Sequence, residues 1–259
     1  MSAGVPADGA VAVRAAGPGA PLFLAYAGAG SVAYAHALHP HVGADVPVYA
    51  LPAPSPSGAP RTVEGMAARL VRMIRAVQPA GPYRVAGWSF GGVLAYEIAS
   101  QLIGQNETVE FLGMIDTYAP ACFRAGPDAG DAASLHALSM DAADGDASPE
   151  TMRDRRRAHQ QALRGYDPQP LPVVVHLFSA QDSPAADPSR GWRELLPERS
   201  LQLTPVPGTH MSMMEPPNVA VLGGALARGL ERARAGGAVP AGGTARAGDD
   251  ASPVVKLRG

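Results

Sequence analysis

The stretch GPYRVAGWSFGGVLAYEIAS, residues 81–100, places a serine between two glycines where an apolar strand gives way to a helix. Residues 83–86 supply the predicted strand, and residues 92–99 supply the predicted helix. The pentapeptide Gly87-Trp88-Ser89-Phe90-Gly91 between them matches G-x-S-x-G, a sharp turn that exposes a serine nucleophile. A Gly-Ser-Gly turn can also occur by chance in a chain with 30 glycines, but the flanking strand and helix favour the catalytic interpretation. The pattern predicts covalent acyl transfer through Ser89.

Apolar runs alternate with helical segments on both sides of this turn. We predict further strands over residues 22–26, 46–51, 109–115, 173–178 and 201–206, and helices over residues 33–38, 62–77 and 218–234. Strands that are apolar throughout and alternate with helices are typical of a mostly parallel sheet covered on both faces. A length of 259 residues with 46% hydrophobic content fits one large α/β domain.

Three segments depart from this alternation. Residues 1–20 are rich in Gly and Pro, with one short strand possible at 11–14, and we expect a flexible N-terminal segment before a domain over residues 21–234. Residues 124–165 are rich in Asp and Ala and end in a charged helical stretch, which predicts a helical lid over the carboxyl edge of the sheet. Residues 235–259 are expected to form a disordered C-terminal tail.

Composition excludes several classes of function. The net charge of −2 and the lack of long basic runs argue against nucleic-acid binding. Cys122 is the single cysteine and cannot form an internal disulfide, and no Cys/His cluster has the spacing of metal ligands. The N-terminus lacks a signal-peptide pattern, and no apolar run approaches the roughly 20 residues of a membrane span. We therefore expect a cytoplasmic protein with neither metal nor membrane anchor.

A serine nucleophile requires a histidine to take its proton and a carboxylate to orient that histidine. In α/β-hydrolases these residues follow in the order Ser, acid, His, each at a strand end. His210, in the loop after the last predicted strand, is the expected base, because the other histidines precede Ser89 or fall within the lid or a strand. Asp116 and Asp182 both follow strands, and position alone leaves them as competing candidates for the acid.

Residues 83–120, in which the elbow is followed by an apolar strand into Ile-Asp-Thr-Tyr-Ala-Pro, resemble the thioesterase domains that end nonribosomal peptide and polyketide synthases. The segments GWRELL and VPGTHMSMMEPPNV are similar to the histidine loop of that family of α/β-hydrolases, and the resemblance covers most of residues 21–230. It implies Asp116 as the acid and His210 as the base. The family often has Gly-Asp-His where this chain has Gly-Thr-His, so any role of that neighbouring aspartate is absent here.

The resemblance also implies a reaction and a partner. An acyl or peptidyl chain would pass from the phosphopantetheine thiol of a carrier protein onto Ser89, and water or an internal nucleophile would then release it. No cofactor is expected beyond the phosphopantetheine of that partner. The chain begins at Met1 and has no carrier domain, so we expect either an excised terminal domain or a free-standing enzyme that edits stalled chains. A generic small-ester hydrolase of the same fold is the alternative.

The oxyanion hole is expected to use the backbone N–H of Phe90 and a second N–H from the loop after the strand at 22–26. The resemblance selects Ala27 as this second donor, with Gly28 close behind. The same loop satisfies G-x-G-x-x-A over residues 28–33, which suggests a dinucleotide-binding module as a competing reading. The sequence argues against this interpretation, because a ribose-binding acid should stand at the end of the next strand, residues 46–51, whereas Asp45 precedes that strand.

A basic run lies in the helical part of the predicted lid, formed by Arg153, Arg155, Arg156 and Arg157. Such runs usually form the solvated face of a helix. Arginine also suits bidentate phosphate contact, so the run is a second candidate for docking a carrier protein and its phosphopantetheine phosphate.

Overall fold

The computed structural model describes residues 9–55, 58–124, 149–183 and 185–236. The start of the predicted N-terminal segment, residues 125–148 of the predicted lid and nearly all of the predicted tail lie outside these described residues.

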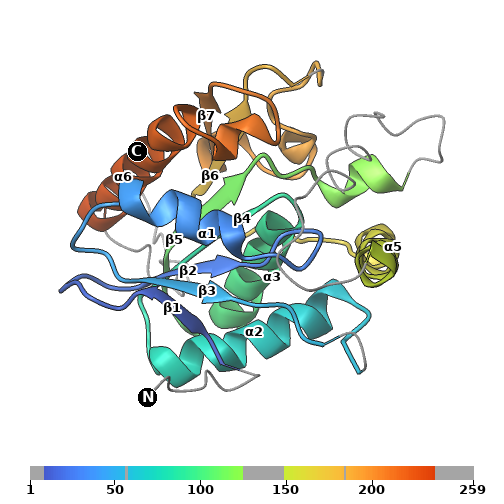
Figure 1. Cartoon of the computed structure of the whole chain (residues 1–259), viewed down its shortest axis with the longest axis horizontal. Coiled ribbons are helices and arrows are strands. Elements are labelled where there is room, and N and C mark those ends of the chain that lie inside the picture. Colours follow the sequence, from blue (N-terminus) through green and yellow to red (C-terminus); the bar gives the residue numbers. More distant parts are fainter. Residues whose placement is uncertain (1–8, 56–57, 125–148, 184, 237–259) are drawn as a thin grey trace, which may run out of the picture.

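Within the described residues the chain forms one mixed sheet of seven strands in the order β1-β3-β2-β4-β5-β6-β7 (Figure 1). The strands are β1 (Val11–Arg14), β2 (Leu22–Ala25), β3 (Val48–Leu51), β4 (Tyr83–Trp88), β5 (Val109–Ile115), β6 (Val175–Ala180) and β7 (Leu201–Val206). β1 pairs with β3 in the antiparallel sense, and every other neighbouring pair is parallel. The prediction of a mostly parallel central sheet is confirmed.

Helices cover both faces of the sheet. They are α1 (Ala33–Leu38), α2 (Val63–Val77), α3 (Phe90–Gly104), α5 (Pro149–Gly165) and α6 (Asn218–Gly236). α2 and α3 pack on one face, and α1 and α6 pack on the other (Figure 1). α2 begins where the sequence indicated, because the Thr62 hydroxyl accepts a hydrogen bond from the N–H of Gly65 at 3.1 Å.

The apolar strands serve two cores at once. In β2, Phe23 and Ala25 join the core under α2 and α3, whereas Leu22 and Leu24 join the core under α1 and α6. Successive side chains of a strand point to opposite faces, so a strand buried on both sides must be apolar at every position. Burying one leucine or phenylalanine side chain completely stabilises the folded state by about 1.5–3 kcal/mol relative to leaving it in water.

Four strands differ in extent from the prediction. β2 ends at Ala25 instead of residue 26, and β6 spans Val175–Ala180 instead of residues 173–178. The strand expected over residues 46–51 begins at Val48, because Val46 donates its N–H to Gly43 in a turn and Pro47 has no N–H to donate to a ladder. β4 extends two residues beyond the predicted strand and ends at Trp88, and α3 begins at Phe90, directly after Ser89. The turn between strand and helix is therefore made by Ser89 alone.

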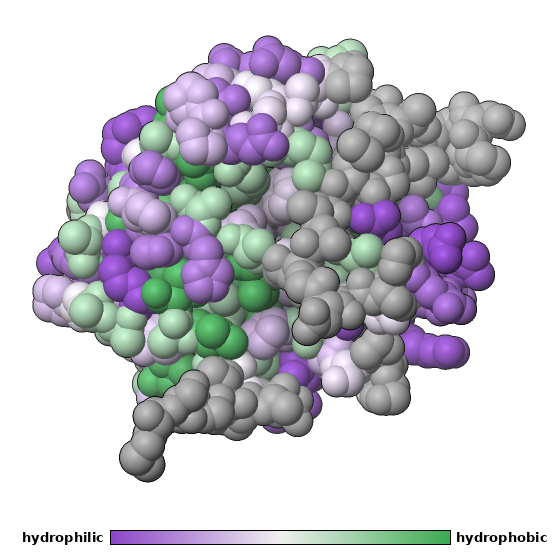
Figure 2. All heavy atoms as spheres, viewed as in Figure 1, coloured by the Kyte–Doolittle hydropathy of each residue, from purple (hydrophilic) through white to green (hydrophobic). Residues whose placement is uncertain are grey.

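α5 confirms the helix predicted in the candidate lid and lies beyond the carboxyl ends of β2 and β3 (Figure 1). Its inward side buries Ala162 and Leu163 against the α2–α3 core. Arg153 and Arg157 are exposed, and the outward side of α5 is hydrophilic (Figure 2). This amphipathic pattern explains why a segment of such polar composition still packs on the domain.

Candidate active site

Ser89 has a backbone conformation that few residues adopt. Its φ is 57° and its ψ is −123°, and its N–H donates to the carbonyl of Ile115 on the neighbouring strand at 2.9 Å. A positive φ in a residue other than glycine is uncommon and costs free energy, so strong packing on both sides must hold it. The strand-to-helix turn predicted from G-x-S-x-G is present.

The glycines on either side of Ser89 leave room for this turn. A Cβ at Gly87 would lie 2.0 Å from the carbonyl oxygen of Gly91, and a Cβ at Gly91 would lie 2.6 Å from the carbonyl oxygen of Ala25. Both distances are far below van der Waals contact with backbone atoms that cannot move aside. The motif requires glycine at both positions because other backbone segments approach each of them too closely to leave room for a side chain.

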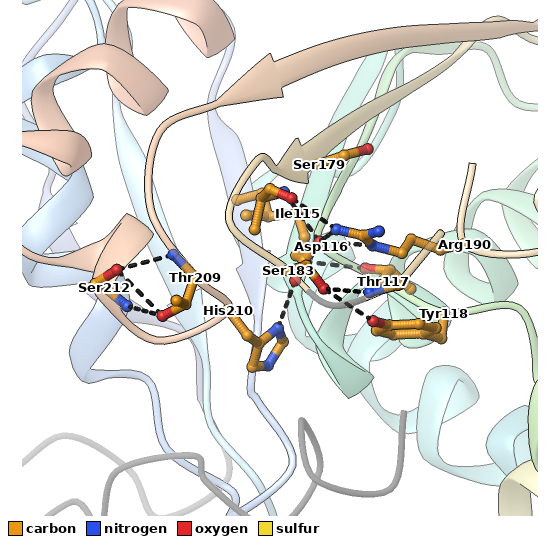
Figure 3. Close-up of polar contacts among 12 residues, drawn as sticks. Ile115, Asp116, Thr117, Tyr118, Ser179, Ser183, Arg190, Thr209, His210 and Ser212 are labelled. Atoms are coloured by element: carbon orange, nitrogen blue, oxygen red, sulfur yellow. Dashed lines mark hydrogen bonds and ion pairs between the residues drawn. The ribbon is translucent and has the colours of Figure 1, made fainter. Parts of the chain in front are cut away.

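Asp116 lies directly after β5 and is fully buried. Its Oδ1 accepts hydrogen bonds from the Ala180 N–H at 3.0 Å and from the Arg190 guanidinium at 2.9 Å, and its Oδ2 lies 2.8 Å from His210 Nδ1 (Figure 3). Burial by itself would raise the pKa of Asp116. The hydrogen bond and charge of His210, the charge of Arg190 and the Ala180 N–H outweigh burial and hold that pKa below its ordinary value, so the carboxylate stays ionised.

His210 extends from the loop after β7 toward Asp116 (Figure 3). The loop is held by Thr209, whose hydroxyl accepts the Ser212 N–H at 3.3 Å and whose own N–H donates to the Ser212 hydroxyl at 2.9 Å. The ring of His210 also stacks on the ring of Trp88 at the end of β4, with centroids 5.2 Å apart. Threonine thus supports the histidine loop at the position where the resembling family often has aspartate.

Asp182, the competing acid, has a different set of contacts. Its carboxylate accepts the N–H of Gly208 at 3.1 Å, and its own N–H donates to the Gly208 carbonyl at 3.0 Å. Of the two candidate aspartates, Asp116 is therefore the one hydrogen-bonded to His210, while Asp182 holds the turn that leads to it.

Arg190 is a site residue that sequence reasoning missed. Its side chain is 1% exposed, its guanidinium forms the ion pair with Asp116, and Nη2 also donates to the Ala180 carbonyl at 2.8 Å. It lies in the long connection between β6 and β7, where a single arginine before Gly191 carries no local signal of burial. Only the fold brings it under the carboxylate.

Replacing Arg190 with methionine should destabilise the protein by about 3–5 kcal/mol at neutral pH, because the buried charge of Asp116 would lose its ion pair with the guanidinium. Denaturant unfolding measures the loss. The matched control is Arg75→Met, which breaks the more exposed pair with Glu107 and should cost only about 0–1 kcal/mol. Equal losses in the two variants would contradict this account.

The stability lost in Arg190→Met should depend on pH, because the pKa of Asp116 is lowered in the folded protein. The pKa of Asp116 in the folded protein lies below its ordinary value of 3.8, so its ionised form stabilises the fold above that pH. This contribution is lost as the pH falls from 3.8 through the folded-state pKa. The difference between the wild type and Arg190→Met should therefore narrow in that range.

The two predicted oxyanion donors belong to separate segments, the start of α3 and the loop after β2. Phe90 is the first residue of α3, and the first N–H groups of a helix have no acceptor within the helix. The Ala27 N–H donates to the Ser31 carbonyl at 2.8 Å, inside a loop that the Gly30 N–H also closes by donating to the Ala27 carbonyl at 2.7 Å. The Ala27 N–H is thus engaged within its own loop, and its role at an oxyanion stays a prediction.

The basic run on α5 divides by orientation. Arg155 points inward and donates to the Ala29 carbonyl at 3.0 Å and the Pro54 carbonyl at 3.1 Å. Arg153 and Arg157 face solvent. Arg155 therefore packs against the loops of its own domain. Arg153 and Arg157 lie at the surface, where contact with the phosphopantetheine phosphate of a carrier protein would require them.

The part of the chain that the structure describes holds no cluster of three or more His, Cys, Asp or Glu side chains arranged for a metal ion. Among the same residues, none of the helices combines the length and apolar character that crossing a membrane requires.

Comparisons with known proteins identify the family of the chain. A family model described as "Thioesterase domain" matches residues 20–224. The chain is 32% identical over 249 residues to the conidial pigment polyketide synthase PfmaE of Pestalotiopsis fici, a match that covers 81% of this chain and 11% of that protein. It is 39% identical over 108 residues to the vanchrobactin synthetase VabF of Vibrio anguillarum, covering 40% of this chain and 4% of that protein.

A solved structure is similar over most of the chain. The NocB thioesterase domain, in covalent complex with a fluorophosphonate nocardicin G analog, matches with a TM-score of 0.70 and 27% identity, covering 83% of this chain and 96% of that domain. By contrast, the chain spans only about a tenth of the length of the first curated relatives, which are whole synthases.

Proposed function

The chain belongs to the thioesterase-domain family, and from this premise we propose that it is a serine thioesterase acting in natural-product biosynthesis. It takes an acyl or peptidyl chain from the phosphopantetheine thioester of a carrier protein onto Ser89. Hydrolysis, or attack by a nucleophile of the chain itself, then releases the product. The curated relatives are polyketide and nonribosomal peptide synthases, which supports a substrate delivered on an acyl or peptidyl carrier protein.

The observation that carries the proposal is the 2.8 Å contact between His210 Nδ1 and Asp116 Oδ2. An ionised carboxylate can only accept a hydrogen bond, so the proton of the imidazole sits on Nδ1 and leaves Nε2 as the base. In this arrangement Asp116 orients the ring and stabilises the imidazolium that forms, without itself becoming protonated.

The proposed reaction proceeds in two steps. The Ser89 oxygen attacks the thioester carbonyl while His210 takes its proton; the C–S bond breaks, and the thiol leaves with that proton. Water or an internal hydroxyl or amine then attacks the acyl-Ser89 ester, again with His210 as base, and the serine is restored. The N–H of Phe90 and an N–H of the loop at residues 27–31 are the proposed donors to the oxyanion in both steps.

A panel of acyl- and peptidyl-pantetheine thioesters, analysed by mass spectrometry, tests this function. We expect thiol release together with either the free acid or a cyclic product lighter by one water. Cleavage of a p-nitrophenyl ester without turnover of any thioester in the panel would contradict the proposal and favour a generic small-ester hydrolase.

A further inference from the structure

Two side chains of α5, one helical turn apart, bind carbonyl oxygens of the loop that follows β2. His159 Nδ1 lies 2.8 Å from the Gly28 carbonyl oxygen, and Arg155 Nη1 lies 3.0 Å from the Ala29 carbonyl oxygen. A helix in the insertion thus contacts consecutive peptide groups of the loop that carries the second predicted oxyanion donor.

The ring of His159 also reaches the other half of the predicted oxyanion hole. It stacks on the ring of Phe90, the residue after Ser89, with centroids 4.2 Å apart and an interplanar angle of 10°. One buried side chain, 4% exposed, therefore contacts both segments that are proposed to donate to the oxyanion.

The chemistry of this contact is well defined. A carbonyl oxygen only accepts hydrogen bonds, so His159 must carry a proton on Nδ1 and act as the donor. Burial lowers the pKa of His159 to about 4, even though the Gly28 carbonyl opposes that shift, so the ring is neutral at physiological pH. His159 is thus a neutral donor of one hydrogen bond.

The loop sequence is suited to this arrangement. Gly30 has a φ of +88°, and a Cβ there would lie 2.0 Å from Arg155 Nη1. Glycine is therefore required both for the backbone conformation and for the approach of the guanidinium. The second glycine of the spacing that matched a dinucleotide motif is thus explained by the packing of α5 on the loop.

We propose that His159 is a positioning residue. By donating a hydrogen bond to the Gly28 carbonyl, it holds in place the loop at residues 27–31, which carries the second proposed oxyanion donor. This inference rests on the proposed function. The physical requirement is that an oxyanion donor lie about 2.7–3.1 Å from the developing charge, and a misplacement of about 1 Å can cost about 10²-fold in rate. Two hydrogen bonds within the loop already hold both the N–H and the carbonyl of Ala27, and the bond from His159 fixes in addition the peptide plane that carries the Gly28 carbonyl.

A competing role for His159 must be separated in the test. The same side chain, with Tyr26 and Met66, lines a cavity of about 310 Å³ between α5, the start of α2 and the loops after β2 and β3. If His159 instead formed part of a wall for the acyl chain, its replacement would affect long acyl thioesters and spare small esters.

Two substitutions divide the contacts of His159 between them. His159→Phe keeps an aromatic ring against Phe90 but cannot donate to Gly28, whereas His159→Asn loses the ring but keeps an N–H donor near the position of Nδ1. Gln161→Ala, at an exposed position on the same helix, is the matched control. Rates are normalised to the folded fraction, and both a long acyl-pantetheine and p-nitrophenyl acetate are used.

We expect His159→Phe to lower kcat by about 10²-fold for both substrates with little change in KM, because the oxyanion forms in either reaction. His159→Asn should retain most of kcat. Wild-type kcat in His159→Phe, a loss confined to the long thioester, or an equal loss in both variants would each overturn the inference. Failure of the wild-type protein to form an acyl-Ser89 intermediate would instead contradict the proposed function, so the two failures are distinguishable.

Discussion

Replacing Ser89 with alanine is expected to abolish thioester turnover and fluorophosphonate labelling together, with a fall in kcat of about 10⁶-fold. The proposed acyl intermediate forms on the Ser89 oxygen, and no other atom at the turn can take its place. The fold should survive, because serine already bears a Cβ at a φ of 57° and alanine removes only one oxygen from a site that is 5% exposed.

The measurement combines steady-state kinetics with intact mass after exposure to a fluorophosphonate. Ser100→Ala, at a half-buried position farther along α3, is the matched control and should label like the wild type. Absence of a phosphonyl adduct on Ser89 in the wild-type protein, or thioester turnover by the alanine variant well above background, would refute the covalent mechanism.

Asp116→Asn is expected to lower the rate of acylation by about 10⁴-fold. The asparagine can turn an N–H toward His210 Nδ1, which would stabilise the tautomer with its proton on Nε2 and leave no base for Ser89. The neutral amide would also fail to stabilise the imidazolium formed during the reaction. Single-turnover acylation, followed by release of the thiol, reports this step directly.

Asp182→Asn provides the matched control for this substitution. Its amide oxygen can still accept the Gly208 N–H that the carboxylate accepts in the wild type, so the histidine loop should keep its position and activity should change little. The reverse pattern, a silent Asp116→Asn with a large loss in Asp182→Asn, would assign the acid to the other strand end.

Features that depend on neighbouring residues were predictable from the sequence. The apolar runs and helical periodicities located the strands and helices to within a few residues, because burial on one or two faces leaves its period in the local sequence. The G-x-S-x-G turn was equally local, since Ser89 and its two flanking glycines are compressed within a single bend of the chain.

The choice between Asp116 and Asp182 could be made from the sequence only through resemblance to a family. Both aspartates follow strands, and no local property distinguishes them. In the structure, β6 lies between β5 and β7, and the loops that follow β5 and β7 meet at the same edge of the sheet. This strand order brings Asp116 within hydrogen-bond distance of His210 and leaves Asp182 bound to Gly208.

The sequence by itself determined a mostly parallel α/β domain with a strained serine turn and a histidine after its last strand. Tertiary structure alone decided that Arg190 pairs with Asp116 and that His159 contacts Gly28. The physical reason is the range of the interactions. Backbone conformation and apolar periodicity are encoded by adjacent residues, whereas a hydrogen bond between distant residues depends on the strand order and the path of every loop between them.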